Sequence, residues 1–349
     1  MEQDEAEDAG LLAQVKDDNE VMRQPPRRTC LDICLDCYKE VILMRQHFLV
    51  SGLVNWETDC RVDRFPIDYA PIHYNFFGVS NCVSGVGCNV AKALSTLGGR
   101  VTLVTLLGQD VTADIALREL TTAGIDCTLV QRPLKETPAS TVLYDHEGRR
   151  RIECDLKDIQ ETAYDFDGVD LSVFNAVIAC NINFSRSLLQ KAKNAGIPVA
   201  VDVHTLSDIH DDYNSEFMRY ADILFLSDEK LPCEPQAFLR TIEDAYGCRI
   251  IVLGQGGRGA LMYVRDEDRF YSLTAARLGT PVNTVGAGDS LFSSFVSLYS
   301  EGLPPVECLK RAEVFAAAKI LTSGASNGFV TREGLEELYA AAAPSICEK

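Results

Sequence analysis

Short apolar runs alternate along most of this chain with segments whose apolar residues recur every three or four positions. The runs lack a regular polar alternation, which is typical of strands covered on both faces, and the spaced segments are typical of helices with one buried side. Repeated strand–helix units predict an α/β fold with a mostly parallel central sheet and helices on both faces. Strands are expected at 47–54, 101–108, 176–180, 197–203, 222–226 and 249–253, and helices near 112–123, 182–195, 237–246, 304–321 and 331–343.

The composition excludes several classes of protein. The chain has 349 residues, of which 46% are hydrophobic, enough for one large domain with a sizeable core. It shows no apolar run long enough to span a membrane, and its acidic N-terminus does not resemble a secretion signal, so we expect a cytoplasmic protein. The net charge of −18 argues against nucleic-acid and membrane partners. Thirteen scattered cysteines are expected to be reduced thiols.

The N-terminal segment differs in composition from the rest of the chain. It is polar and acidic and ends in a Pro-Pro-Arg-Arg run, which is typical of a loosely attached extension. The predicted organisation is an acidic, cysteine-containing extension at 1–46, a main domain at 47–343 and a tail at 344–349.

Three cysteines of this extension, Cys30, Cys34 and Cys37, have C-x3-C-x2-C spacing. Radical-SAM enzymes bind an iron–sulfur cluster with this spacing, but the rest of the chain does not resemble them, and no fourth Cys or His follows closely for zinc. An amphipathic segment with three thiols and a metal-binding module both remain open.

The stretch 283–289 (NTVGAGD) carries the clearest chemistry and runs directly into an apolar helical pattern. Its small residues leave backbone N–H groups accessible, and a helix N-terminus adds the positive end of the dipole, so the turn is a candidate anion site. Asp289 lies in the first turn of that helix. A carboxylate there suits a general base for a hydroxyl that attacks a phosphoryl group. A glycine-rich turn with Asp as a helix cap is the alternative that the pattern alone leaves open.

This stretch resembles the signature [DN]-T-x-G-A-G-D of the ribokinase/pfkB family of carbohydrate kinases. A second stretch, 84–98 (SGVGCNVAKALSTLG), resembles the family's N-terminal signature G-G-x-x-x-N-x-A-x-x-L-x-x-L-G. The resemblance implies the ribokinase-like three-layer α/β fold. It also implies that the amides of Gly286, Ala287 and Gly288 hold the transferred phosphoryl group while Asp289 activates the acceptor hydroxyl.

The resemblance further implies a sugar-binding site. Asn55 and Glu57 follow the first strand and match the family's G-x-x-N-x-D opening, with Glu57 in place of the usual Asp. Together with Gly85, Gly87 and Asn89 of the second stretch, they are expected to contact the acceptor.

Two excursions from the strand–helix repeat match the small β lid of this family. One is 58–83, which contains the aromatic run 73–78, and the other is 139–154, with a turn at Glu147-Gly148. Aromatic side chains on a lid can cover a ligand or pair the lids of two subunits. A homodimer through the lid is therefore an open expectation.

The family's nucleotide site corresponds to the C-terminal half of the chain. The turn 254–260 (GQGGRGA) resembles the family's T-L-G-x-x-G-A, and the loop 323–328 corresponds to one that lies near the adenine. The residues expected at the nucleotide are Ser227, Gly256, Gly259, Thr284 and Asn327.

The expected cofactors are ATP and Mg²⁺. Residues 227–230 (SDEK) stand where the family has N-x-x-E, a motif tied to magnesium and phosphate. Lys230 occupies the usual Glu position, so Glu229 is the candidate metal ligand. Some family members bind a monovalent cation near the 323–328 loop, and such a cation is a further open expectation.

The leading interpretation is ATP-dependent phosphorylation of a primary hydroxyl on a small sugar or nucleoside, with Asp289 as the general base. This is the chemistry of a phosphotransferase with an alcohol group as acceptor. Val86 stands where ribokinases typically have Lys, so a pseudouridine-type nucleoside and a pentose are both open as acceptors. A non-catalytic sensor that binds a sugar or nucleotide on the same fold is the alternative, motivated by the altered 227–230 segment.

Overall fold

The structure, a computed structural model, describes residues 46–147 and 149–347. The predictions made for the N-terminal extension, including Cys30, Cys34 and Cys37, lie outside the described residues, as does the end of the expected tail.

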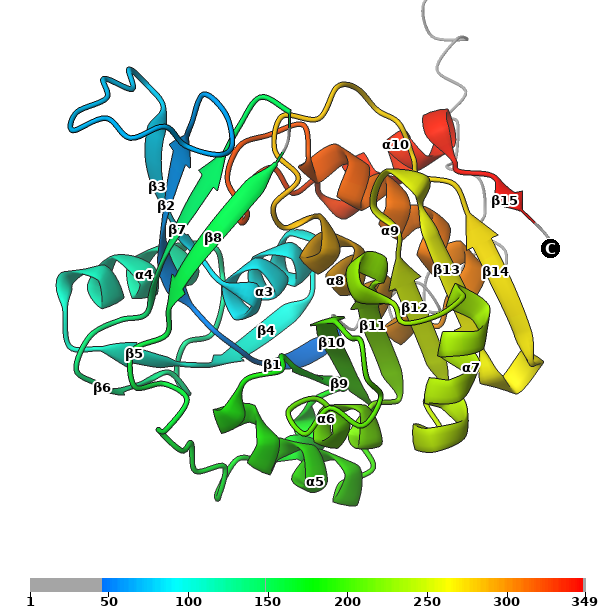
Figure 1. Cartoon of the computed structure of the whole chain (residues 1–349). Coiled ribbons are helices and arrows are strands. Elements are labelled where there is room, and N and C mark those ends of the chain that lie inside the picture. Colours follow the sequence, from blue (N-terminus) through cyan, green and yellow to red (C-terminus); the bar gives the residue numbers. More distant parts are fainter. Residues whose placement is uncertain (1–45, 148, 348–349) are drawn as a thin grey trace, which may run out of the picture. The chain divides into compact units, whose positions relative to one another are not determined.

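A nine-stranded sheet runs through the described part of the chain, in the order β15-β14-β13-β12-β11-β10-β9-β1-β4. The strands from β4 to β12 in this order pair in parallel, and the last three pair antiparallel at one edge. This arrangement confirms the mostly parallel sheet (Figure 1). The bounds are β1 His47–Ser51, β4 Arg100–Val104, β9 Ala176–Ala179, β10 Val199–Thr205, β11 Ile223–Ser227, β12 Ile250–Gly254, β13 Ala260–Val264, β14 Arg269–Leu273 and β15 Ile346–Cys347.

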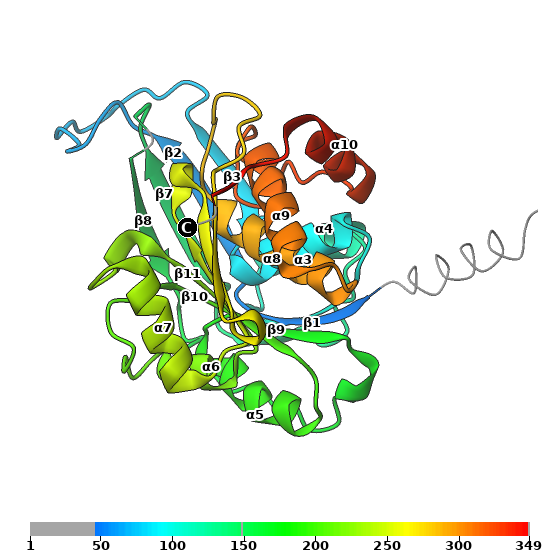
Figure 2. The same cartoon turned by 90° about the vertical axis from the view of Figure 1, so that its right-hand side faces the viewer.

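Helices cover both faces of this sheet, and each face has its own core. Along β11, Ile223 and Phe225 belong to one buried cluster, whereas Leu224 and Leu226 belong to the other, as expected for a strand buried on both sides. Figure 2 shows α3, α8 and α9 on one side of the sheet and α5, α6 and α7 on the other. The bounds are α3 Val86–Thr96, α4 Val111–Thr122, α5 Arg186–Asn194, α6 Ser215–Tyr220, α7 Pro235–Tyr246, α8 Ala287–Ser300, α9 Pro305–Lys319 and α10 Arg332–Ala342.

The prediction of a single strand at 101–108 was wrong, because the backbone changes its hydrogen-bonding partner strand at Thr105. The carbonyl of Val104 accepts from Gly52, whereas the carbonyl of Thr105 accepts from Gln131. The chain therefore leaves the central sheet after β4. It continues as β5, Leu106–Gly108, which pairs with β6, Gln131–Leu134. An unbroken apolar run in the sequence does not show where the backbone changes from one partner strand to another.

The two excursions from the core join in one four-stranded sheet, in the order β3-β2-β7-β8. The strands are β2 Asn55–Arg61, β3 Val79–Ser84, β7 Ala139–Tyr144 and β8 Arg150–Asp155. This sheet is the lid that the sequence predicts (Figure 1). The segment between β2 and β3 exposes a group of large apolar side chains, which includes Ile67, Tyr69, Ile72, Tyr74, Phe76 and Phe77.

Candidate active site

The N-terminus of α8 forms the predicted glycine-rich turn. Gly286 caps the helix with a left-handed φ of 80°, and a Cβ atom there would lie 2.5 Å from the carbonyl oxygen of Ala325. Only glycine fits this position. The side-chain oxygen of Asn283 accepts a hydrogen bond from the amide of Val285 at 2.9 Å, which shapes the turn before the helix. The first amides of a helix have no partner within it, so this turn can hold an anion.

Asp289 links the two sequence signatures. The side-chain Nδ2 of Asn89 on α3 donates a hydrogen bond to Oδ2 of Asp289 at 2.7 Å. Helix α3 packs directly on α8. Burial raises the pKa of Asp289, and the nearby Asp202 raises it further, whereas the hydrogen bond from Asn89 and the neighbouring His204 and Lys319 lower it. A carboxyl group under such opposing influences suits the predicted role of Asp289 as a general base.

Asn55 and Glu57, two of the residues predicted to bind the phosphoryl acceptor, lie together at the base of the lid. Asn55 donates to the hydroxyl of Ser140 at 2.7 Å, and this hydroxyl donates to Glu57 at 3.3 Å. Asp59 lies on the same face of β2, buried with 4% exposure. Burial and the neighbouring Asp59 raise the pKa of Glu57.

Some buried oxygens of this region have no hydrogen-bond partner among the described residues. They are Oδ1 of Asn55, Oδ1 of Asp59 and Oδ1 of Asn89. All three atoms accept hydrogen bonds, so they suit a ligand that offers donors, such as a polyhydroxylated sugar.

Gly85 and Gly87 have a structural reason to be glycine. A Cβ on Gly87 would lie 2.5 Å from the carbonyl carbon of Gly52, and one on Gly85 would lie 2.6 Å from the carbonyl oxygen of Leu53. The amide of Gly87 donates to the same Leu53 oxygen at 2.9 Å. These glycines let α3 begin against the end of β1. Their predicted contact with the acceptor stays a prediction.

A cavity of about 530 Å³ extends from the α8 turn along α9 to the β12–β13 turn. Five of its lining residues are among those predicted at the nucleotide or phosphoryl group, namely Gly256, Gly259, Thr284, Ala287 and Gly288. The structure does not place the other two predicted nucleotide residues, Ser227 and Asn327, among the lining residues.

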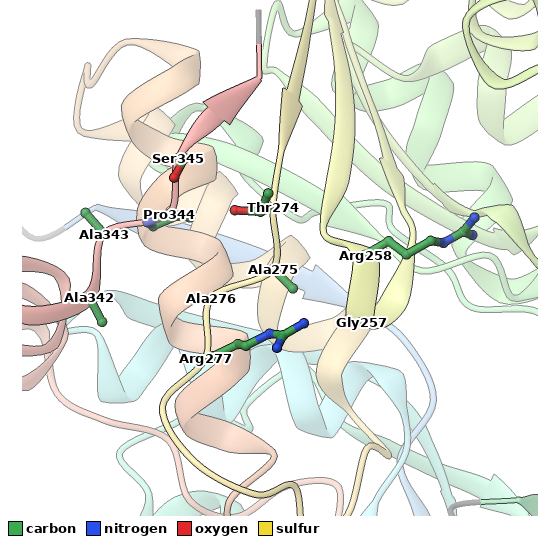
Figure 3. Close-up of a pocket in the computed structure, with 10 residues that line it drawn as sticks. All are labelled: Gly257, Arg258, Thr274, Ala275, Ala276, Arg277, Ala342, Ala343, Pro344 and Ser345. Carbon is green, nitrogen blue, oxygen red and sulfur yellow. The ribbon is translucent and has the colours of Figure 1, made fainter.

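A second hollow of about 650 Å³ adjoins this cavity and shares Gly257 and the segment 275–277 with it. Its opposite wall is the C-terminal segment 342–345 (Figure 3). Figure 3 shows Arg277 extending toward the Gly257 turn, away from that segment.

A short 3₁₀ turn, Asp228–Lys230, follows β11, and its two acids face arginines. The carboxylate of Asp228 is paired with Arg258. Glu229, the predicted metal ligand, has a side chain 64% exposed and lies 3.9 Å from Arg150 of β8. Arg150 also donates to the hydroxyl of Thr284 at 3.1 Å. Two carboxylates here fit the oxygen ligands that Mg²⁺ prefers, and the arginines suit phosphates.

A different set of residues could hold a metal at the lid. Ligand atoms of Glu57, Asp59 and Cys82 all lie within 4.8 Å of one another. Burial and the charge of Glu57 raise the pKa of the Cys82 thiol to about 12, however, which disfavours the thiolate that a metal needs.

The sequence reasoning missed Lys319, the last residue of α9. Its side chain is fully buried and donates to the carbonyl oxygen of Gly324 at 2.7 Å. Burial lowers its pKa to about 8, although the negative charges of Asp289, Asp59 and Glu57 favour the ammonium form. Asp59 and Ser140 were also missed, although the alternation of Asn55, Glu57 and Asp59 along one strand could have indicated Asp59.

Comparison with known proteins defines the class. The model of the pfkB family of carbohydrate kinases matches residues 45–332, so the chain belongs to this family. It is a phosphotransferase, and the predicted enzyme class is confirmed.

The relatives are sugar kinases. The 2-dehydro-3-deoxygluconokinase of Bacillus subtilis is 24% identical over 75% of this chain and 88% of its own length. The ribokinase of Dictyostelium discoideum is 22% identical over 82% of this chain and 98% of its own length.

Solved structures confirm the ribokinase-like fold. A microbiome-derived acarbose kinase superposes with a TM-score of 0.76 at 24% identity and covers 85% of this chain and 99% of that one. Arabidopsis thaliana ribokinase in complex with ribose and ATP gives a TM-score of 0.69 at 18% identity, over 84% and 99% of the two chains. Among the described helices, none is both long and apolar enough to cross a membrane.

Proposed function

We propose that this protein transfers the γ-phosphoryl group of ATP to a primary hydroxyl of a small sugar or nucleoside, with Asp289 as the general base. One observation carries the proposal. Asp289 accepts a hydrogen bond from Asn89, whose buried Oδ1 has no hydrogen-bond partner among the described residues. Asp289 also lies in the first turn of α8, and this turn lines the cavity of about 530 Å³. Phosphoryl transfer requires a general base that lies between the site of the phosphoryl donor and the site of the hydroxyl acceptor. Asp289 lies between the cavity and the buried oxygens that can accept hydrogen bonds from a sugar.

The reaction follows from this placement. The acceptor hydroxyl gives its proton to the carboxylate of Asp289, and its oxygen forms a bond to the γ-phosphorus while the bond to the bridging oxygen of ADP breaks. The backbone amides at Ala287 and Gly288 and the α8 dipole stabilise the charge on the transferred group. Lys319 and Asn89 help to keep Asp289 ionised for this step.

The metal prediction rests on the short 3₁₀ turn that follows β11. Asp228 and Glu229 would hold Mg²⁺, which supplies positive charge against the phosphates. Arg150 and Arg258 now pair with these two acids and would bind the phosphate oxygens. Nothing in the described 323–328 loop adds support for a monovalent cation.

The acceptor site favours hydroxyl-rich ligands. Asn55, Glu57, Asp59 and Asn89 offer oxygens that accept hydrogen bonds, so pentoses and the ribose of nucleosides, pseudouridine included, are the proposed acceptors. Gly85 and Gly87 would contribute by bringing the start of α3 close to this site. Free thiols among the described cysteines are consistent with a cytoplasmic enzyme.

We also propose that two copies of the chain associate through the lid. The exposed apolar group between β2 and β3 supports this, because large exposed apolar patches mark interaction surfaces. Sedimentation of the wild type and of a Tyr69→Ser, Phe77→Ser variant tests it. A monomeric wild type would contradict the proposal.

The test of the main proposal is an ADP-release assay against ribose, other pentoses, pseudouridine and ordinary nucleosides. Asp289→Asn should lower kcat by about 10²- to 10⁴-fold. Asp244→Asn, an exposed acid on α7, is the control and should leave kcat unchanged. If no acceptor is turned over while sugars or nucleotides still raise the melting temperature, a binding sensor becomes the better account.

A further inference from the structure

Helix α9 forms one wall of the cavity of about 530 Å³ that is proposed to bind the nucleotide. Glu313, Ala316, Ala317 and Ile320 all line it, and their spacing of three, four and seven residues places them along one stripe of α9 and its C-cap. The cavity therefore follows the helix from its end back toward its middle.

The C-terminal end of this stripe is the phosphate end of the cavity. The carbonyl oxygen of Ile320 accepts from the amides of Val282 and Asn283, at 2.8 and 3.2 Å, directly before the glycine turn of α8. Glu313 precedes Ile320 by seven residues, which is about 10 Å along a helix. In an extended nucleotide, the base and the terminal phosphate are separated by a distance of this order. Glu313 thus lies where the base would bind.

The surroundings of Glu313 are mainly apolar or backbone. Its side chain is 7% exposed and shares the cavity wall with alanines, glycines, Leu278 and Pro281. Among the lining residues, Arg277 is the other one with an ionisable side chain. The charged residues of α9 nearest in sequence, Lys310 and Arg311, pair with Glu307.

These surroundings favour the protonated form of the Glu313 carboxyl group. Burial raises the pKa of Glu313 to about 8, although a hydrogen bond from the backbone of Ala276 opposes the shift. A protonated carboxyl group has one donor and one acceptor side by side, whereas a carboxylate only accepts.

We infer that Glu313 reads the hydrogen-bonding edge of the purine and selects adenine over guanine. Adenine offers an acceptor at N1 next to the N6 amino donor, which complements a neutral carboxyl group. Guanine offers donors at N1 and N2, which complement a carboxylate. This inference rests on the proposed use of the cavity for ATP, and it adds a residue that sets which nucleotide is chosen.

The inference has a consequence for pH. As the pH rises through about 8, Glu313 becomes a carboxylate, and the preference for adenine should fall. Glutamine carries a donor and an acceptor at every pH, so a Glu313→Gln protein should prefer adenine throughout.

The experiment measures binding, because it then needs no acceptor. Calorimetry with the magnesium complexes of AMP-PNP and GMP-PNP is carried out at pH 6.5 and 8.5 on the full chain. The variants are Glu313→Gln, Glu313→Leu and, as a matched control, Glu301→Gln. Glu301 is also a carboxyl whose pKa is raised by burial, but it pairs with Arg332 and is not among the cavity residues.

The wild type and the Glu301→Gln control should bind AMP-PNP more tightly at pH 6.5, by about ten- to a hundredfold, as expected for a bidentate base contact. The ratio of the dissociation constants for GMP-PNP and AMP-PNP should be smaller at pH 8.5. Glu313→Gln should keep the preference at both pH values, and Glu313→Leu should lose it at both.

Two results would overturn the inference. One is a wild-type adenine preference in Glu313→Leu. The other, decisive even if the leucine variant does not fold, is an adenine preference with the same pH dependence in the wild type and in Glu313→Gln. Failure of both nucleotides to bind any of the proteins would instead remove the proposed nucleotide cavity, and this inference with it.

Discussion

Lys319 provides a sharp test of the catalytic arrangement, because its effects on stability and on activity should separate. The ammonium is fully buried, donates to Gly324 and lies near Asp289, with no carboxylate close enough for a described ion pair. Methionine at this position keeps a similar length and removes the charge.

The stability effect follows from the pKa. A fall from 10.5 to about 8 means that the folded protein disfavours the ammonium by about 3 kcal/mol at pH 7. This cost is fully present below pH 8 and disappears as the pH rises to 10.5. Lys319→Met removes it but leaves the Gly324 carbonyl without its donor, at a cost of about 1–3 kcal/mol. The two contributions nearly cancel, so the free energy of unfolding at pH 7 should change by less than about 2 kcal/mol.

The activity effect has the opposite character. Without the ammonium, the pKa of Asp289 should rise, since a nearby opposite charge lowers the pKa of a carboxyl group. The acidic limb of the kcat profile should therefore move to higher pH.

The assays are urea unfolding at pH 7, 9 and 10.5 and ADP release over the same range extended to pH 5. The wild type should gain stability between pH 8 and 10.5 relative to Lys319→Met. Lys310→Met on the same helix, which removes a lysine paired with Glu307, is the control and should leave the acidic limb in place. An unmoved acidic limb in Lys319→Met, or a loss of more than about 4 kcal/mol at pH 7, would refute the reasoning.

Three further predictions concern neighbouring contacts. Asn89→Ala removes the hydrogen bond that lowers the pKa of Asp289, so kcat should fall and its acidic limb should move to higher pH, whereas an unchanged profile would separate Asn89 from the base. Gly87→Ala should destabilise the fold by about 2 kcal/mol or more, because its Cβ would clash with the backbone of Gly52, directly after β1. Gly334→Ala in α10, where a Cβ has room, should instead stabilise the fold by about 0.5–1 kcal/mol. Equal melting temperatures of the two variants would contradict this prediction. Arg150→Ala should raise the KM for ATP several-fold and leave the melting temperature nearly unchanged, since this side chain is 40% exposed, and an unaltered KM would exclude its contact with phosphate.

The sequence by itself determined the local elements and the reactive turn. Apolar runs and helical spacing set most strands and helices of the central sheet, because burial of one or both faces leaves a periodic trace. The glycine-rich turn with Asp289 was likewise readable, since a turn of small residues before a helix is a local feature. The edge strands β13 to β15 and the division of 101–108 were not, because partner choice leaves no such trace.

Only the tertiary structure decided which distant side chains meet. β1 lies between β9 and β4 in the sheet, and this order brings the start of α3 against α8 and thus Asn89 to Asp289. Lys319 and Glu313 occupy ordinary positions of a helical pattern, where an isolated sequence suggests solvent-exposed charges. They are buried because α9 packs on α8 beside the cavity, and burial, which no local pattern encodes for a single residue, is what gives both groups their altered pKa values.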